Sequence, residues 1–356
     1  ASNQRIEQSK QLEKSAVDIN KTDFYFNKDQ NNIAPNNLPL NVLGISQSIQ
    51  FPTVYSAQRK VAQSKTQLIT DQYLLDKRSI TKEVSIAYFE IVYWQQMLKN
   101  YIYLDSLYAS FEHAANRRFE QGESNYLEKL TAETKRKEVS LMLNQVKESI
   151  NKSYITLNQW LQSDASLKVV NDSMIRIELV PIDTLNHPAL SYYADALRLS
   201  SQEVSLEKNK MLPDLSVSVF QGTNNGTGTQ SYSGFQVGIA VPLWFGNQKS
   251  KISAAKTGVS ILELESKNYK TQLVAKYEAL HADLRRLSEG INYYESTGKQ
   301  VATETLFHAI KAYQSGEINF LQYTQLLDNS KSIEINYLTT LFQYNMTVLE
   351  ANYLMN

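Results

Sequence analysis

The chain has 356 residues, and its 36 basic and 36 acidic side chains leave it without formal net charge. This balance gives no whole-molecule attraction to nucleic acid, and no basic patch with interleaved aromatic residues occurs along the sequence. The absence of Cys excludes disulfides, thiolate catalysis and Cys-based zinc sites. With only 7 Pro and 12 Gly, the composition favours long uninterrupted elements, and no apolar run is long enough to predict a transmembrane helix.

Residues 1–187 form the first of two predicted structural repeats. A short helix comes first, and the segment LGISQSIQF then alternates apolar with small or polar residues, which is the period of a pleated strand. A long stretch without Pro or Gly follows, with apolar residues recurring at three and four positions as in a helix. The predicted elements are strands at about 22–30 and 41–51, a long helix at about 53–118, a returning helix at about 125–161 and an equatorial linker at 162–187.

The second predicted repeat, residues 188–356, has the same order of elements. A helix begins near His187 and Pro188, and the segment GFQVGIAVPL alternates as the first one does. Each long helix has a length on the order of 90–100 Å, more than a globular domain buries. The predicted elements are strands at about 213–222 and 233–244, a long helix at about 250–313 and a returning helix at about 319–354.

Four strands cannot close a barrel or build a sizeable sandwich, yet lipid does not tolerate open sheet edges. Strands with one apolar row and one small polar row suit a membrane-spanning barrel, although a soluble sandwich with one wet face has the same alternation. We therefore expect several copies of the chain to form one shared barrel, and three copies would supply twelve strands. The linker carries a β-prone patch at 175–180 and is expected to pack as a collar outside the helices.

Two pairs of segments repeat in the same order. RFEQGESNYLEKL and AYQSGEINFLQYT align on Gly122 and Gly316, 194 positions apart (316 minus 122). FPTVYSAQR and VPLWFGNQK align on Pro52 and Pro242, 190 positions apart (242 minus 52). In the first pair, Gly accepts the positive φ of a turn between helices, and the Asn three residues later is a good N-cap. A turn does not explain why Glu, an aromatic residue and Leu are repeated with them.

No catalytic, cofactor-binding or metal-binding constellation is predicted. The four His residues are scattered without ligand spacing, and ordinary helix-surface histidines are expected. His113 and His308 each lie about two turns before a turn glycine, so a pH- or metal-sensitive ring in an oligomer is the alternative interpretation. The segment NNGTGTQ lacks the Lys and the strand–helix context of a phosphate loop.

The segments GISQSIQFPTVYSAQRK and RRFEQGESNYLEKLTAE are similar to the TolC outer-membrane efflux protein family, in its heavy-metal efflux (CusC/CzcC-type) branch. The resemblance covers essentially the whole chain. It implies a mainly α fold with a small β part, in which three copies form an α-barrel continued by a 12-stranded transmembrane β-barrel with four strands per chain. It also implies an outer-membrane location in a Gram-negative bacterium, with the helices extending into the periplasm.

The implied function is a non-enzymatic exit duct of a tripartite efflux system, exporting heavy-metal cations such as Cu/Ag or Co/Zn/Cd. The implied partners are two further copies of the chain, a periplasmic adaptor (membrane fusion) protein, an inner-membrane RND pump and outer-membrane lipid, without nucleic acid or a cofactor. A drug-efflux or type I secretion duct of the same fold is one alternative. A soluble coiled-coil scaffold whose strand pairs form a dimerisation sheet is another.

In the resembled family, the tips of the helical hairpins form the periplasmic entrance and dock the adaptor. The second tip departs from the first in having Ala312 where the first has Arg118, which puts an ion pair there in doubt. Glu128, Gln322 and Asp328 are candidate gate residues near the tips. The residues carried over as the docking site are Arg118, Phe119, Gly122, Glu123, Asn125, Tyr126 and Leu127 in the first hairpin, and Tyr313, Gly316, Glu317, Asn319, Phe320 and Leu321 in the second.

Overall fold

A computed structural model describes residues 2–33, 36–163, 167–170, 173–180, 187–224 and 226–355 of the chain. The chain folds as two compact units. The first unit comprises Ala1–Asp76 and Asn186–Thr271, and the second comprises Lys77–Leu185 and Gln272–Asn356. Two long helices, α2 (Pro52–Glu120) and α5 (Phe245–Tyr293), contribute to both units. No helix in the described part of the chain is both long and apolar enough to cross a membrane.

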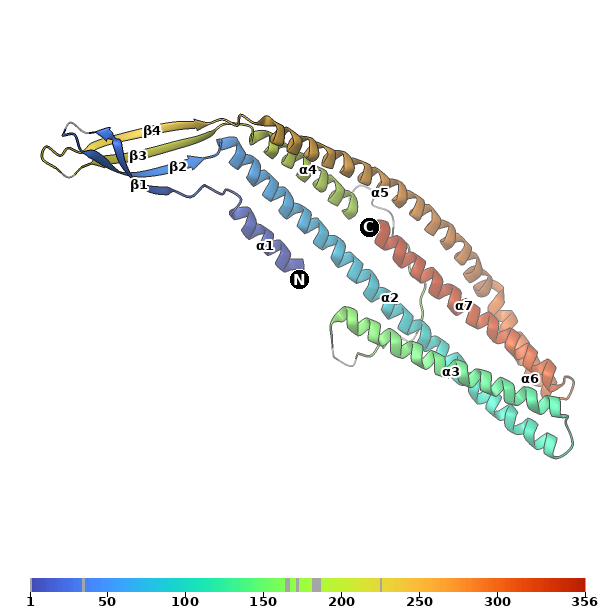
Figure 1. Ribbon diagram of the computed structural model, residues 1–356. Helices are drawn as coiled ribbons and strands as arrows, with labels where there is room; N and C mark the ends of the chain where they lie inside the picture. Colours follow the sequence, from blue (N-terminus) through green and yellow to red (C-terminus); the bar gives the residue numbers. More distant parts are fainter. Residues whose placement is uncertain are drawn as a thin grey trace. The chain divides into compact units, whose positions relative to one another are not determined.

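The first unit contains a four-stranded antiparallel sheet in the order β1-β2-β3-β4 (Figure 1). Strands β2 and β3 come from different halves of the sequence but pair directly, with Ile45 opposite Val219. The predicted small β part of a mainly helical fold, with four strands per chain, is therefore confirmed. The strands are β1 (Asp23–Ile33), β2 (Pro39–Ile49), β3 (Asp214–Thr223) and β4 (Tyr232–Ala240).

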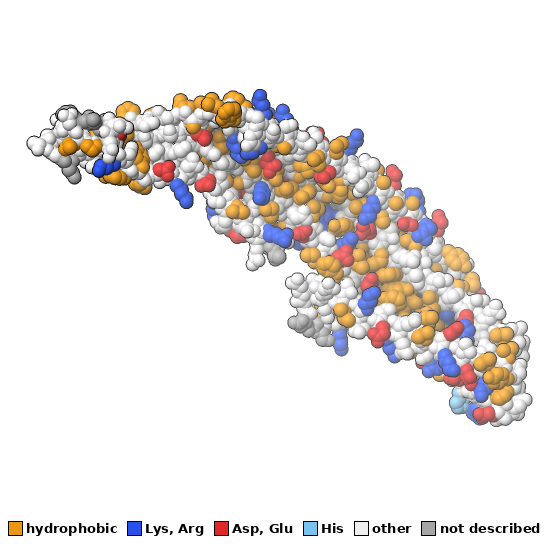
Figure 2. Space-filling view, viewed as in Figure 1, with side chains coloured by type: hydrophobic (Ala, Val, Ile, Leu, Met, Phe, Trp, Pro, Cys, Tyr) orange, Lys and Arg blue, Asp and Glu red, His pale blue; other side chains and the backbone are white. Residues whose placement is uncertain are grey.

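The two faces of the sheet differ in chemistry. One face carries large exposed apolar side chains, interrupted by Gln47 and Gln221. Figure 2 shows patches of hydrophobic side chains over the sheet. The other face carries mostly Gly, Ser, Asn and Asp, with a few aromatic rings. The exposed apolar row consists of Phe24, Phe26, Leu43, Ile45, Val217, Val219, Phe235, Val237 and Ile239.

Strand β4 ends earlier than the alternation predicts, at Ala240 rather than near 244. Pro242 has no N–H to donate to a ladder, and helix α5 already begins at Phe245. The first unit is completed by α1 (Ser2–Lys14), by α4 (Pro188–Asn209) and by the sheet-proximal parts of α2 and α5. Helix α4 starts where the sequence predicts, because Pro188 occupies its first turn and the His187 side chain accepts a hydrogen bond from the Ala189 N–H.

The second unit consists of two helical hairpins. The far part of α2 packs with α3 (Tyr126–Leu161), and α6 (Lys299–Gln314) packs with α7 (Phe320–Met355). The predicted long helix at about 250–313 is not continuous, because a π-helical turn, η1 (Tyr294–Gly298), separates α5 from α6. The second repeat has 74 residues between Pro242 and Gly316 (316 minus 242), against 70 between Pro52 and Gly122 (122 minus 52). A π-turn accommodates an extra residue within a helix, so it absorbs part of this difference, and Tyr294 stacks on Tyr337 of α7 there, with ring centroids 3.9 Å apart.

The β-prone patch in the linker is not a strand. Within 173–180 the backbone runs along α7, where side-chain amides take the place of a strand partner: Asn345 accepts from the Ile177 N–H at 2.9 Å and Asn352 accepts from the Val180 N–H at 2.9 Å. Met174 and Ile177 pack on a cluster from α5 and α7. Three parts of the predicted collar, 164–166, 171–172 and 181–186, lie outside the described residues.

Candidate functional site

The turn between α2 and α3 is built by the two residue types that the sequence singles out. Gly122 has φ +76°, the Gly122 N–H donates to the Phe119 carbonyl at 3.0 Å, and the Glu123 N–H donates to the Arg118 carbonyl at 2.8 Å. This pattern closes the C-terminus of a helix with a left-handed residue. Asn125 then caps α3 by accepting from the Glu128 N–H at 2.9 Å. The predicted roles of this Gly and this Asn in the turn are confirmed.

The turn between α6 and α7 repeats this geometry. Gly316 also has φ +76°, and the Glu317 N–H donates to the Ala312 carbonyl at 2.9 Å. Asn319 accepts from the Gln322 N–H at 2.9 Å, while the Gln322 side chain accepts from the Asn319 N–H at 3.0 Å. This reciprocal pair is a capping box, which fixes the start of α7.

The two tips differ at one matched pair of positions. In the first hairpin, Arg118 donates to Glu128 at 2.9 Å and ties the end of α2 to the start of α3. The matching residues of the second hairpin are Ala312 and Gln322, and the Gln side chain is used in the capping box instead. An ion pair this exposed contributes at most about 1 kcal/mol, so the difference changes the surface charge of the tips more than their stability.

Each tip has a pair of aromatic rings at matched positions, but their surroundings are not alike. Phe119 and Tyr126 are 5.9 Å apart, and Tyr313 and Phe320 are 6.4 Å apart, both edge to face. Phe320 is only 3% exposed, because it packs on Ala115 and Ala132 of the first hairpin. Its counterpart Tyr126 is 61% exposed. The second hairpin is therefore seated on the first through Phe320, whereas Tyr126 has no such cover.

A small groove of about 170 Å³ lies between the starts of α3 and α7. It brings together several of the predicted docking residues from both hairpins. Leu127 and Leu321 are exposed at its edge. Thr131 also lines it, one helical turn after Leu127, and the i, i+4 spacing on one helix face is the signal in the sequence that could have found it. The groove is lined by Asn125, Leu127, Glu128, Thr131, Asn319, Phe320 and Leu321.

The remaining predicted docking residues do not line this groove. Glu123 and Glu317 are exposed in the turns themselves. Arg118 faces Glu128, and the rings of Phe119, Tyr126 and Tyr313 lie in the aromatic pairs. Gly122 and Gly316 shape the backbone and carry no side chain.

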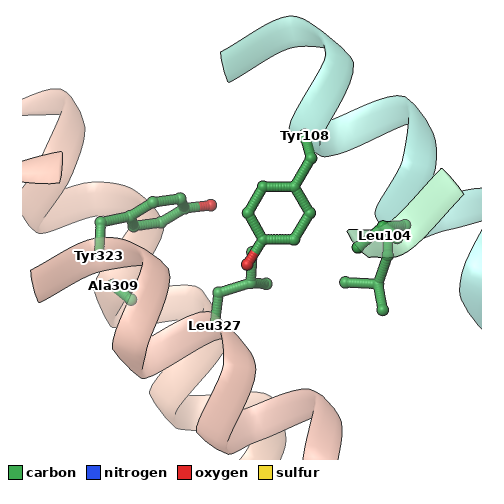
Figure 3. Close-up of a cluster of buried hydrophobic side chains, with 6 residues drawn as sticks. Leu104, Tyr108, Ala309, Tyr323 and Leu327 are labelled. Carbon is green, nitrogen blue, oxygen red and sulfur yellow. The ribbon is translucent and has the colours of Figure 1, made fainter. Parts of the chain in front are cut away.

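The candidate gate residue Asp328 ties three helices together. It accepts a hydrogen bond from the Tyr108 hydroxyl of α2 at 2.6 Å and pairs with Lys135 of α3 at 3.0 Å. Tyr108 is 1% exposed, and Figure 3 shows it reaching from α2 between Leu104 and the α7 residues Tyr323 and Leu327. Burial and then the hydrogen bond to Asp328 raise the pKa of Tyr108, so its hydroxyl stays protonated as the donor. Sequence reasoning missed Tyr108 and Lys135, since their partner lies on a helix about 200 residues away.

The other candidate gate residues also have partners. Glu128 is held by Arg118, and Gln322 belongs to the capping box. His113 and His308 are exposed on α2 and α6. Within the described ranges, no group of three or more His, Cys, Asp or Glu side chains is placed to hold a metal ion.

The fold can be compared with those of known proteins. No family model and no curated protein sequence matches the chain. Among solved structures, a membrane protein from Pseudomonas aeruginosa superposes with a TM-score of 0.83 at 13% identity, covering 100% of this chain and 89% of that one. Together with the two channel structures described next, this match shows that the chain has the TolC-like outer-membrane channel fold.

Two further structures support the same conclusion. The CmeC outer membrane channel of Campylobacter jejuni matches with a TM-score of 0.78 at 14% identity, covering 99% of this chain and 81% of that chain. The transmembrane channel CusC also matches with a TM-score of 0.78, at 12% identity, covering 100% of this chain and 88% of that chain. Because CusC and CmeC score equally, the likeness is to the channel fold as a whole and not to one branch of it.

Proposed function

We propose that the chain is the outer-membrane exit duct of a tripartite efflux system. The observation that carries the proposal is the unpartnered apolar face of the four-stranded sheet, in a fold shared with outer-membrane channels. In water, nine large apolar side chains on one open sheet face would be an aggregation surface. In a bilayer, the same face would contact lipid, as the outward face of a transmembrane barrel does.

The edges of the sheet support a trimer. Strands β1 and β4 are the outer strands of the order β1-β2-β3-β4, and each therefore has one side without a partner among the described strands. Lipid offers no hydrogen bonds to such an edge, so it must be closed by further strands. Three copies, each contributing four strands, would close a twelve-stranded barrel.

The helical hairpins support the same assembly. Tyr126, Leu130, Leu141 and Ile155 are exposed on one face of α3. Their counterparts in the second repeat are all buried or half-buried, because that face of α7 packs on the first hairpin. Within one chain, this face of α7 packs on the first hairpin. We expect the matching face of α3 to pack in the same way on the second hairpin of a neighbouring copy. The α7 counterparts are Phe320, Thr324, Ile335 and Leu349.

The paired tips are the proposed docking site for a periplasmic adaptor protein, which would link the duct to an inner-membrane RND pump. The groove between α3 and α7 offers exposed Leu127 and Leu321, with Glu123 and Glu317 in the adjoining turns. An apolar groove with acidic turns beside it suits a partner that presents an apolar side chain flanked by basic ones. The tie through Asp328 would hold the hairpins together until a partner engages the tips.

Heavy-metal cations are the proposed cargo, on the resemblance of the segments around Gly44 and Gly122 to the heavy-metal efflux branch. The proposal is tested by expressing the chain with a heavy-metal-type RND pump and its adaptor in a Gram-negative host that lacks its own channel. We expect increased resistance to copper, silver, cobalt, zinc or cadmium. Resistance to dyes or drugs alone would keep the duct but replace its cargo.

The docking site is tested in the same strain. Charge reversal of both tip glutamates, Glu123→Lys with Glu317→Lys, should abolish resistance while the amount of trimer in the outer membrane is unchanged. The matched control reverses two exposed glutamates of α5, Glu278→Lys with Glu289→Lys, and should retain resistance. Full resistance with the tip pair reversed would contradict the docking assignment.

A further inference from the structure

The small-residue face of the sheet carries two aromatic rings at one level, each beside a glycine. Tyr25 of β1 is opposite Gly44 of β2, Gly44 is opposite Phe220 of β3, and Phe220 is opposite Gly234 of β4. Aromatic residues and glycines therefore alternate across all four strands at this level.

The glycines are needed for the position of the rings. A Cβ at Gly44 would collide with the outer end of the Tyr25 ring, and a Cβ at Gly234 would be 2.5 Å from the Phe220 Cζ, closer than real Cβ contacts come. Each ring thus lies across the neighbouring strand, along the sheet instead of standing up from it. Both lean in the same direction, from β1 towards β2 and from β3 towards β4. Rings in this position line the wall without filling the space in front of it.

The charges on this face have one sign. Asp23 lies two residues before Tyr25 on the same face of β1, and Asp214 lies on the same face at the start of β3. Asp29, also on this face, accepts from the Asn31 N–H. In the described strands, the one basic residue is Lys28. Because side chains alternate between the two faces along β1, Lys28 lies on the apolar face with Phe24 and Phe26. The small-residue face combines aromatic rings with carboxylates and, in the described strands, has no basic residue.

Aromatic rings attract cations through their π faces, and the attraction grows where water is excluded. Rings of carboxylates likewise select cations in a pore. A metal ion that keeps its hydration shell gains from the carboxylates but little from the rings. An organic cation with an apolar or aromatic body gains from both.

We propose that Tyr25 and Phe220, with Asp23 beside Tyr25, form a binding site for organic cations on the inner wall of the barrel. The site rests on the proposed duct, because only a closed barrel turns this face inward. Three copies would supply three Tyr25 and three Phe220 rings, which contact cargo as it leaves. The duct would accordingly hold organic cations at its exit in addition to passing metal ions.

The test measures binding of benzyltrimethylammonium to the detergent-purified chain by equilibrium dialysis against empty micelles. Benzenesulfonate, which has the same ring and the opposite charge, is the ligand control. We expect saturable binding of the cation and none of the anion. Tyr25→Leu with Phe220→Leu should weaken binding about five-fold or more, and Asp23→Asn should weaken it as well.

Two matched variants separate recognition from folding. Tyr25→Phe with Phe220→Tyr keeps both rings and should keep the wild-type affinity. Phe24→Leu with Phe26→Leu removes rings from the opposite face and should change nothing. Equal affinity in the ring-less and wild-type proteins, or equal binding of the anion, would overturn the site.

The same samples distinguish this inference from the duct itself. If the chain is a trimer and the ring-less variant binds as well as the wild type, only the cation site is wrong. If the chain is not a trimer in detergent, the proposed duct fails, and the site fails with it because its face is not enclosed.

Discussion

Removing one hydroxyl from the contact between the hairpins should loosen the tips without unfolding the protein. Tyr108→Phe deletes the donor to Asp328 and keeps the buried ring, while Lys135 remains as a partner of the carboxylate at 3.0 Å. A hydrogen bond to a charged group contributes about 1.5–3 kcal/mol. Local separation of α7 from the first hairpin should therefore become about 10- to 100-fold more frequent, at about 1.4 kcal/mol for each factor of ten.

The assay is hydrogen exchange of the detergent-purified protein, read on peptides from the first halves of α3 and α7. Exchange through local opening follows the opening equilibrium. Protection of these peptides should therefore fall about 10- to 100-fold, while protection of the sheet should not change. Tyr103→Phe is the matched control, since Tyr103 is exposed on the same helix. If Tyr108→Phe and Tyr103→Phe give the same protection as the wild type, the tie through Asp328 does not hold the hairpins together.

Two further predictions concern buried groups of the helices. Asp71 of α2 is 6% exposed, and burial followed by its contact with Asp195 of α4 raises its pKa from 3.8 to about 6. A raised pKa in the folded state favours the protonated form, so thermal stability should fall as pH rises from about 4 to above 6. Asp71→Asn should flatten this pH dependence. An unchanged slope in the variant would refute the role of Asp71. Phe320→Ala removes a ring that is 3% exposed and should destabilise the single chain by about 3–5 kcal/mol, whereas Tyr126→Ala should leave the single chain intact and weaken the trimer. Equal effects of the two substitutions on unfolding midpoint and trimer dissociation would contradict the proposed interface.

The local parts of the fold could be predicted because each has a short-range cause. Alternation with a period of two identifies the strands and their apolar face, as in the segment containing Leu43 and Ile45. Positive φ at Gly122 and Gly316 follows from the residue type and its place between two helical patterns. Four strands in one chain of a mainly helical fold could likewise be inferred from the sequence.

Features that depend on distant packing could not be predicted. The π-turn at Tyr294–Gly298 is signalled only by the unequal spacing of the repeats, which does not say where the extra length is taken up. The linker near Ile177 reads as a strand because its residues are β-prone, but Asn345 and Asn352 of α7 satisfy its backbone instead. The partnership of Tyr108 with Asp328 depends on how the two hairpins pack.

The candidate site divides in the same way. The capping roles of Asn125 and Asn319 follow from local sequence, and so does the loss of an ion pair where Ala312 replaces Arg118. The burial of Phe320 and the exposure of its counterpart Tyr126 do not, because matched positions in a duplicated chain acquire different neighbours. This difference within the duplication is also what points to a further copy of the chain as the missing neighbour of α3.

The central claim is that three copies of this chain form one membrane duct, and the mass of the purified particle tests it most directly. Light scattering of the 356-residue chain extracted from outer membranes, with the detergent contribution subtracted, should give three times the chain mass of 40.6 kDa. Extraction should require detergent, because the apolar face of the sheet would lie in lipid. A monodisperse dimer that stays in solution without detergent would contradict the account.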